Sequence, residues 1–325
     1  MEDHEVTVPF RGLIMVDHKV NAACTGKKTG KTVRTAVRDF EAGQTQTSEK
    51  LMNPKKIICR PFTVIAAAAL LAAAMPASGF CTDFEVYGKI EHFRWKEYDG
   101  GSELLEESGP VYSVGGIADF PLAEPVSVKL RGELFGGSVD YDGETQPPES
   151  YPVTTDTDYL GAKLEADLGW DITVTEKLTL TPFAGIGARL WERDIQSALF
   201  LDESTQTVKI ARGVTEQWRN YYTRAGLSGN RSFAGQWTGF FKAGFKIPVY
   251  TENVVESTVL EPGNRLSGFA ELGLESGMFK ITLFYEGLRF SKSDRVYFYD
   301  GTNYGYMYQP ESKADIFGIS AGIAF

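Results

Sequence analysis

The stretch Asp315–Phe325, DIFGISAGIAF, alternates apolar residues with small or polar ones down to a terminal phenylalanine. Successive side chains of a β-strand point to opposite sides, so a period of two predicts a strand with two different faces. One face carries Phe317, Ile319, Ala321, Ile323 and Phe325, and the other carries Ile316, Gly318, Ser320, Gly322 and Ala324. We therefore expect a final strand here, and we expect the same pattern in the strands beside it.

The same alternation recurs in stretches of about ten residues from Asp83 onward, and no helical pattern of any length interrupts it. In Tyr159–Trp170, leucine, alanine and tryptophan occupy one face, and tyrosine, glycine and charged residues occupy the other. Similar stretches are Val126–Leu134, Leu178–Leu190, Trp237–Val249 and Leu266–Leu274. A tilted strand that crosses a bilayer needs about 9 to 11 residues of this kind. A soluble sandwich with one wet face is the alternative.

The connections between these stretches alternate strictly between long and short. Long polar segments lie near 96–110, 141–158, 194–216, 251–264 and 291–314, and short turns lie near 123–125, 175–177, 234–236 and 276–277. This arrangement predicts an all-β fold, a single transmembrane antiparallel up-and-down β-barrel of ten strands, with eight or twelve as alternatives. The expected strands are 83–95, 110–121, 125–140, 158–173, 178–193, 217–232, 236–250, 264–275, 278–291 and 313–325.

A secretory signal peptide is expected at residues 52–79. Met52 opens a basic stretch, an apolar run follows from Phe62 to Met75, and small residues come at Ala77 and Gly79. The run is too short for a membrane-spanning helix, and a buried Ala-rich helix is the alternative. Cleavage after Gly79 would leave residues 80–325 as the mature barrel. We interpret residues 1–51 as a mis-assigned translation start or a disordered extension.

The segment after residue 79 is acidic. Residues 1–79 carry 11 of the 33 lysines and arginines and 7 of the 43 aspartates and glutamates, so residues 80–325 carry 22 and 36, a net charge of −14. Such a chain repels nucleic acid. Cys81 is the one cysteine left, so no intramolecular disulfide is expected, and we interpret Cys81 as an inert thiol, with lipidation as the alternative.

In its strand pattern, signal peptide and closing strand, the chain resembles the small bacterial outer-membrane β-barrel superfamily, which includes porin-like proteins. The resemblance covers essentially all of residues 80–325 and rests on no diagnostic motif. It implies a place in the outer membrane of a Gram-negative bacterium, with both ends on the periplasmic side. It also implies that Phe325 belongs to the signal read by the barrel-assembly machinery, and that outer-membrane lipid and lipopolysaccharide surround the barrel.

Aromatic residues near the expected strand ends suggest the two interfacial girdles that such barrels carry. Ten residues make up this expected set: Trp95, Tyr98, Tyr112, Phe120, Tyr141, Trp170, Trp191, Trp218, Tyr250 and Phe290. For each residue taken singly, the alternative is that it packs in the core.

Charged residues on the inward faces are balanced, with nine of each sign. They are Glu85, Lys89, Glu91, Asp119, Lys129, Arg131, Glu133, Lys163, Glu165, Asp167, Arg189, Arg224, Lys242, Lys246, Glu271, Glu275, Lys280 and Glu286. A ten-strand barrel is only slightly wider than the eight-strand size that side chains can fill. Unpaired charges there would lose solvation, so we expect a salt-bridged lumen with some trapped water. A narrow porin-like channel is the alternative.

Candidates for catalysis are few. Ten-strand barrels include the omptin proteases, which need paired acidic groups and a histidine at the extracellular rim. After residue 79 the sequence has one histidine, His92, which Glu91 and Glu97 could orient, with Ser113 on the next strand as a conceivable nucleophile. No motif of that family surrounds it, so we expect no enzyme, no metal site and no cofactor. A rim-site hydrolase acting at the outer-leaflet surface is the third alternative.

The long connections carry the remaining signal. The first two are acidic, which suits either solvation or divalent cations that bridge lipopolysaccharide phosphates. The fifth is rich in aromatic residues: Tyr297, Phe298, Tyr299, Tyr304, Tyr306 and Tyr308. Exposed tyrosines favour recognition, and a lid over the barrel mouth is the alternative. The sequence therefore suggests a surface-contact or envelope-structural protein whose extracellular ligand is unknown.

Overall fold

The computed structural model describes residues 7–9, 14–18, 83–145, 150–202, 205–233, 235–299 and 304–325. The expected signal peptide and most of residues 1–51 lie outside the described residues. Two short strands of that upstream segment are described, β1 (Thr7–Pro9) and β2 (Ile14–His18), and both belong to the same compact unit as residues 80–325. None of the described segments is a helix with the length and apolarity to cross a membrane.

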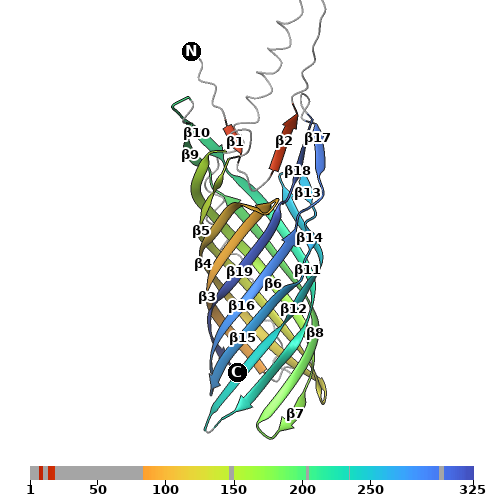
Figure 1. The fold of residues 1–325 in the computed structure, drawn as a ribbon. Helices are drawn as coiled ribbons and strands as arrows, with labels where there is room; N and C mark the ends of the chain where they lie inside the picture. The colour runs from red at the N-terminus through yellow and green to blue at the C-terminus, as the bar shows by residue number, and fades with distance from the viewer. Residues whose placement is uncertain are drawn as a thin grey trace, which may run out of the picture. The chain divides into compact units, whose positions relative to one another are not determined.

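Ten antiparallel strands form a closed barrel, as the alternation predicted (Figure 1). Each strand pairs with the next along the chain, and the last pairs with the first, from Glu311 opposite Tyr98 to Ala324 opposite Glu85. Closure leaves the wall without an unpaired edge. The strands are β3 (Asp83–Asp99), β4 (Ser102–Ala123), β5 (Val126–Glu144), β6 (Pro152–Trp170), β8 (Leu178–Ile195), β11 (Val214–Ser232), β12 (Trp237–Val255), β15 (Ser267–Ser276), β16 (Phe279–Ser291) and β19 (Glu311–Ala324).

The short turns and the carboxy-terminus lie at one end of the barrel, beside β7 (Ile172–Thr175) (Figure 1). In outer-membrane barrels the short-turn side is periplasmic, so we call the opposite end extracellular. The extracellular connections contain further short strands. These are β9 (Ala198–Asp202), β10 (Thr207–Arg212), β13 (Thr258–Leu260), β14 (Gly263–Asn264), β17 (Val296–Tyr299) and β18 (Tyr304–Tyr308). Two of them also pair with the upstream strands, β10 with β1 and β18 with β2.

The outward faces change from apolar to charged at one level of the wall. On β3, exposed Val86 and Ile90 give way to Arg94 and Lys96, and on β8, exposed Ile186 is followed by Glu192 and Asp194. The apolar part is the membrane-facing band, and the charged part faces water. Strands of 17 to 22 residues, such as β3 and β4, are longer than a bilayer requires. The barrel therefore continues well above the membrane-facing band.

This continuation corrects the loop expected at 96–110. There β3 and β4 stay paired up to Asp99 opposite Ser102, and the turn consists of Gly100 and Gly101, both at positive φ (59° and 88°). Above the band both faces of these strands carry polar residues, so the hydropathy alternation disappears while the pairing continues. For the same reason β5 and β6 remain paired through much of the expected loop at 141–158.

Half of the expected aromatic girdle lies inside the barrel instead. Trp95, Tyr141, Trp191, Trp218 and Phe290 are all buried and belong to one hydrophobic cluster. Tyr112, Trp170 and Tyr250 are exposed on the outer face, and Tyr98 and Phe120 are half-buried. For Trp95, Tyr141, Trp191 and Trp218 the expectation failed because their strands extend beyond the assigned ends, so each residue is within a strand and points inward. The strand of Phe290 ends as assigned, and Phe290 points inward by its position in β16.

Aromatic side chains narrow the lumen by lying over glycines of the neighbouring strand. Tyr222 is opposite Gly187, and a Cβ atom on Gly187 would lie 2.5 Å from the tyrosine ring. Tyr87 and Gly115 make the same kind of pair between β3 and β4. Since only glycine leaves this space, these pairs let the rings fill the cross-section against the wall.

Candidate functional site

The structure places all eighteen of the expected inward charges on the inner face of the barrel, where strand register gives them a common side. We call this set, together with its ion pairs, the lumen network. Most of its members come together in ion pairs with one another. Glu91 accepts a hydrogen bond from Ser113 at 2.7 Å, and Glu275 lies opposite Lys280 in register.

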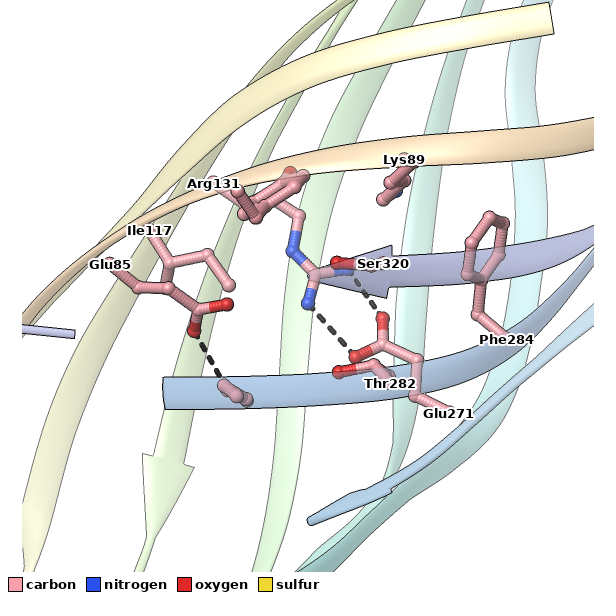
Figure 2. Close-up of a pocket in the computed structure, with 10 residues that line it drawn as sticks. Glu85, Lys89, Ile117, Arg131, Glu271, Thr282, Phe284 and Ser320 are labelled. Atoms are coloured by element: carbon pink, nitrogen blue, oxygen red, sulfur yellow. Dashed lines mark hydrogen bonds and ion pairs between the residues drawn. The ribbon is translucent and has the colours of Figure 1, made fainter. Parts of the chain in front are cut away.

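Two of the ion pairs cross the full diameter of the barrel. Arg131 on β5 donates two hydrogen bonds to Glu271 on β15, at 2.5 and 3.0 Å (Figure 2). Lys163 on β6 bonds Glu286 on β16 at 3.0 Å. In each case the two strands are five apart in a ring of ten, which is the largest separation the ring allows. Side chains from opposite walls therefore meet in the centre of the lumen.

The other pairs link these two bridges into a continuous layer. Glu133 contacts Lys89 and Lys163, and Glu286 contacts Lys163, Arg189 and Lys246. From Lys246 the contacts continue through Glu165, Arg224 and Asp167 to Lys242. Asp119–Lys129 and Glu85–Lys280 pair at the periplasmic side. Eight of the eighteen charges have more than one ion-pair partner, which offsets the desolvation of burying them.

Little space remains between these side chains. A cavity of about 20 Å³ lies beside the Arg131–Glu271 bridge, lined by Glu85, Lys89 and Thr282 among others (Figure 2). A water molecule needs roughly 10 to 15 Å³ measured in this way. The cavity therefore has room for about one water and none for a solute.

A second cluster, which we did not expect from the sequence, lies above the lumen network. Arg193 on β8 is fully buried and pairs with three carboxylates, Glu97 at 3.0 Å, Glu107 at 2.6 Å and Glu216 at 3.0 Å. These residues come from β3, β4, β8 and β11. We call the four residues the Arg193 cluster. It lies above the membrane-facing band, because outward Arg94 and Lys96 flank it on β3.

Aromatic residues enclose the Arg193 cluster. The rings of Trp191 and Trp218 stack with centroids 5.3 Å apart, and Trp95 meets Trp218 edge-on at 5.2 Å. The indole N–H groups of Trp95 and Trp218 donate to Glu97 and Glu216, at 2.9 and 2.8 Å. The tryptophans thus surround the cluster, and two of them each donate to one oxygen of a carboxylate. Charge and aromatic packing together close the barrel at this level.

The sequence did contain a signal for this second cluster. Trp95 and Glu97 continue the inward parity of β3, as Glu216 and Trp218 do on β11. The inward face was not assigned to these residues, because Glu97 and Glu216 were placed in loops and Trp95 and Trp218 in the aromatic girdle. Arg193 lies within the expected strand 178–193 and shares the inward parity of Arg189, and extending the neighbouring strands until their parity broke would have placed Glu97 and Glu216 inside as well. The identity of its partners would still have been missing.

Glu97→Gln should flatten the pH dependence of stability above pH 5. Burial raises the pKa of Glu97 to about 8, against the opposing effect of Arg193, and Glu216 raises it further. A carboxyl whose pKa is higher in the folded state adds stability that is complete below its unfolded pKa, near 4.5, and is lost as the pH rises toward 8. Urea midpoints of wild type and variant between pH 5 and 9 test this, with exposed Glu103→Gln as control. Parallel profiles for Glu97→Gln and wild type would contradict it.

The candidate catalytic residues are not brought together. His92 is on the outer face of β3, with its ring 4.9 Å from that of Phe317, whereas Ser113 is buried inside and donates to Glu91. Glu91 and Glu97 also point inward, so neither orients the imidazole. The expectation is corrected because His92 has the opposite parity to these three residues. Within the described ranges, no set of three or more His, Cys, Asp or Glu residues is arranged to hold a metal ion.

The aromatic residues of the fifth connection divide between surface and core. Tyr297 is 74% exposed, whereas Tyr308 is 4% exposed and packs with Leu104. Tyr306 is half-buried, and its ring lies between those of Tyr297 and Tyr308, at 5.9 and 6.2 Å. The side chains of Phe298, Tyr299 and Tyr304 lie outside the described residues. Phe325, the expected assembly signal, is 70% exposed at the end of the chain.

Comparisons with known proteins identify a fold. The chain matches no protein-family model. A 50-residue segment is 50% identical to protein DJ-1 homolog D of Arabidopsis thaliana and covers 15% of this chain. The chain spans only 13% of that protein, so it assigns no family.

Solved structures of outer-membrane proteins were found to be similar to the chain. The outer membrane protease OmpT of Escherichia coli superposes with a TM-score of 0.55 at 10% identity, covering 77% of this chain and 99% of that one. An outer membrane channel from Pseudomonas putida F1 has a TM-score of 0.36 at 10% identity, with 78% and 98% covered. Ail, the attachment invasion locus protein of Yersinia pestis, has a TM-score of 0.28 at 12% identity, with 75% and 98% covered. With its closed ten-strand wall and its likeness to OmpT, the chain has the fold of the Gram-negative outer-membrane β-barrel proteins.

Proposed function

We propose that this protein is a closed, non-conducting outer-membrane barrel that presents its extracellular hairpins for contact with other molecules. The observation that carries the proposal is the pair of bridges across the lumen, Arg131–Glu271 and Lys163–Glu286. A solute would have to break both and then pass the Arg193 cluster. The side chains involved are multiply bonded, so opening this path is costly.

The extracellular end supports the contact role. The hairpin β17–β18 presents Tyr297, a large and exposed aromatic side chain, on a rigid base in which Met307 packs with Val255 and Leu260. Tyrosine supplies contact area at a low entropic cost. In this proposal the surrounding partners are outer-membrane lipid and lipopolysaccharide, and the barrel-assembly machinery acts during biogenesis. The likeness to a protease is one of fold, and among the described residues the catalytic candidates His92 and Ser113 lie on opposite faces of the wall.

The wild-type barrel should show no stable conductance in planar lipid bilayers. The double variant Arg131→Ala/Glu271→Ala should also stay closed, because the Arg193 cluster still blocks the lumen above the missing bridge. Single-channel recording at both polarities measures this. A large, stable conductance in the wild type would overturn the proposal in favour of a narrow channel.

The contact role predicts a loss of binding in Tyr297→Ser. Wild type and variant, purified and placed in lipid nanodiscs, are tested for binding to intact Gram-negative cells and to lipopolysaccharide. The barrel wall should be unaffected, because Tyr297 is exposed and outside the wall. The exposed Leu199→Ser on β9 is the matched control. Equal binding by Tyr297→Ser and wild type would argue against contact through this hairpin.

A further inference from the structure

A strand edge at the extracellular end carries an added strand. The barrel wall is closed, but the hairpin β17–β18 stands outside it, and β18 has one edge not used by β17. The upstream strand β2 pairs antiparallel with that edge over five residue pairs, from Tyr304 opposite His18 to Tyr308 opposite Ile14 (Figure 1). The unused N–H and C=O groups of such an edge form a template for another strand.

The hairpin β9–β10 also pairs with an upstream strand at one edge. The upstream strand β1 pairs with β10 in parallel, over Thr7–Pro9 opposite Ile210–Arg212. Two separate hairpins thus accept an extended segment at their edges. The β18 edge is the longer of the two ladders, and its geometry is antiparallel, which pairs slightly better than parallel.

The strand that occupies this edge comes from a part of the chain that export is expected to remove. Ile14–His18 precedes the signal peptide expected at 52–79, so an exported chain that begins at Phe80 has no such strand of its own. We propose that the β18 edge of the exported barrel is a docking site for an extended segment of a partner protein, which adds to the hairpin as an antiparallel strand. This proposal rests on the contact role proposed above, and it specifies the kind of partner.

The hairpin is held in a shape suited to this addition. Met307 packs into the cluster with Val255 and Leu260, and Tyr308 is buried against Leu104. Lys292 lies 3.8 Å over the Tyr308 ring and bonds Asp99 on β3 at 2.8 Å. The hairpin is therefore tied to the wall before a partner arrives, which lowers the ordering cost of binding.

The neighbouring side chains indicate the chemistry of the partner segment. Tyr297, Tyr306 and Tyr308 form an aromatic row beside the edge, and exposed Arg295 lies 4.4 Å over the Tyr306 ring. Such a row suits aliphatic side chains at alternate positions, and the arginine favours a carboxylate nearby. In register with β18, the segment Ile14–His18 (IMVDH) sets Val16 and Ile14 opposite Tyr306 and Tyr308, so it stands in for the aliphatic part of the partner. Main-chain hydrogen bonds would supply affinity, and the alternate side chains specificity.

The experiment uses a peptide of residues 11–20, RGLIMVDHKV, as the probe. The barrel is expressed from Met52 with its own signal, purified from outer membranes, and checked by mass to begin at Phe80. The labelled peptide should bind, and hydrogen exchange at residues 304–308 should slow. Protection at 207–212 instead, or no binding, would overturn the proposal. If the full chain, expressed from Met1, yields an outer-membrane barrel that retains residues 11–20, the proposal would also be overturned, because the edge would then be occupied by the chain itself.

Two N-methylated peptides separate strand addition from side-chain stickiness. One is methylated at the amides of Met15 and Asp17, the other at those of Val16 and His18. In an added edge strand, alternate amides point toward the hairpin, so one peptide should bind about tenfold or more weakly and the other about as well as the parent. Equal binding by both would contradict strand addition. If the peptides fail while Tyr297→Ser still loses binding, the contact role stands without the β18 site.

Discussion

Arg193→Met should destabilise the folded barrel by about 3 to 5 kcal/mol, because it leaves three buried acidic side chains without their shared cation. Urea unfolding in lipid vesicles, followed by tryptophan fluorescence, is the measurement, since Trp95 and Trp218 adjoin the cluster. The loss should shrink when Glu107→Gln is added.

The matched control is Arg219→Met on the outer face of β11. Arg219 pairs with Glu252, but its side chain is 49% exposed, so the pair contributes under about 1 kcal/mol. Similar losses for the two variants would mean that Arg193 is not the buried centre described here. Loss of folding in Arg193→Met alone, with recovery on adding Glu107→Gln, would still support the cluster.

Leu164→Arg should cost about 2 to 4 kcal/mol when the barrel is refolded in a bilayer. Leu164 is 63% exposed in the middle of the apolar face of β6, so an arginine there would meet hydrocarbon. The control is Leu199→Arg on β9, at the extracellular end. Leu199 is 70% exposed but faces water, so its replacement should cost almost nothing. Equal costs at the two sites would show that the membrane-facing band has been misplaced.

Glu165, the inward neighbour of Leu164, is expected to be sensitive to substitution. It contacts Lys246, Arg224 and Arg131 in the lumen network, so a neutral replacement leaves several cations short of a partner. In detergent and in lipid alike, Glu165→Gln should therefore destabilise the barrel. The lipid-face effect, in contrast, requires the bilayer. Comparing each variant in detergent and in lipid therefore distinguishes the loss of ion pairs in the lumen from the loss of contacts with the bilayer.

The sequence alone predicted the barrel, its ten strands and the inner face of the eighteen charges of the lumen network. These are local properties, because side-chain direction follows from position within a strand. Lys163 and Leu164 could be assigned to opposite faces without knowing any neighbour. The same parity, followed further, also separates His92 from Ser113.

Only the tertiary structure decided which residues meet. Arg131 and Glu271 are 140 residues apart, and their contact depends on strand number, tilt and register taken together. The extracellular ends of the strands could not be predicted from the sequence either. Above the membrane both faces of a paired strand carry polar residues, so its hydropathy pattern looks like that of a loop. For this reason Trp95 and Trp218 were predicted to be girdle residues, whereas in the structure they pack around Arg193 inside the barrel. The face to which a side chain points is set locally, by its position in the strand. Which side chains meet across the lumen is set by the geometry of the closed barrel.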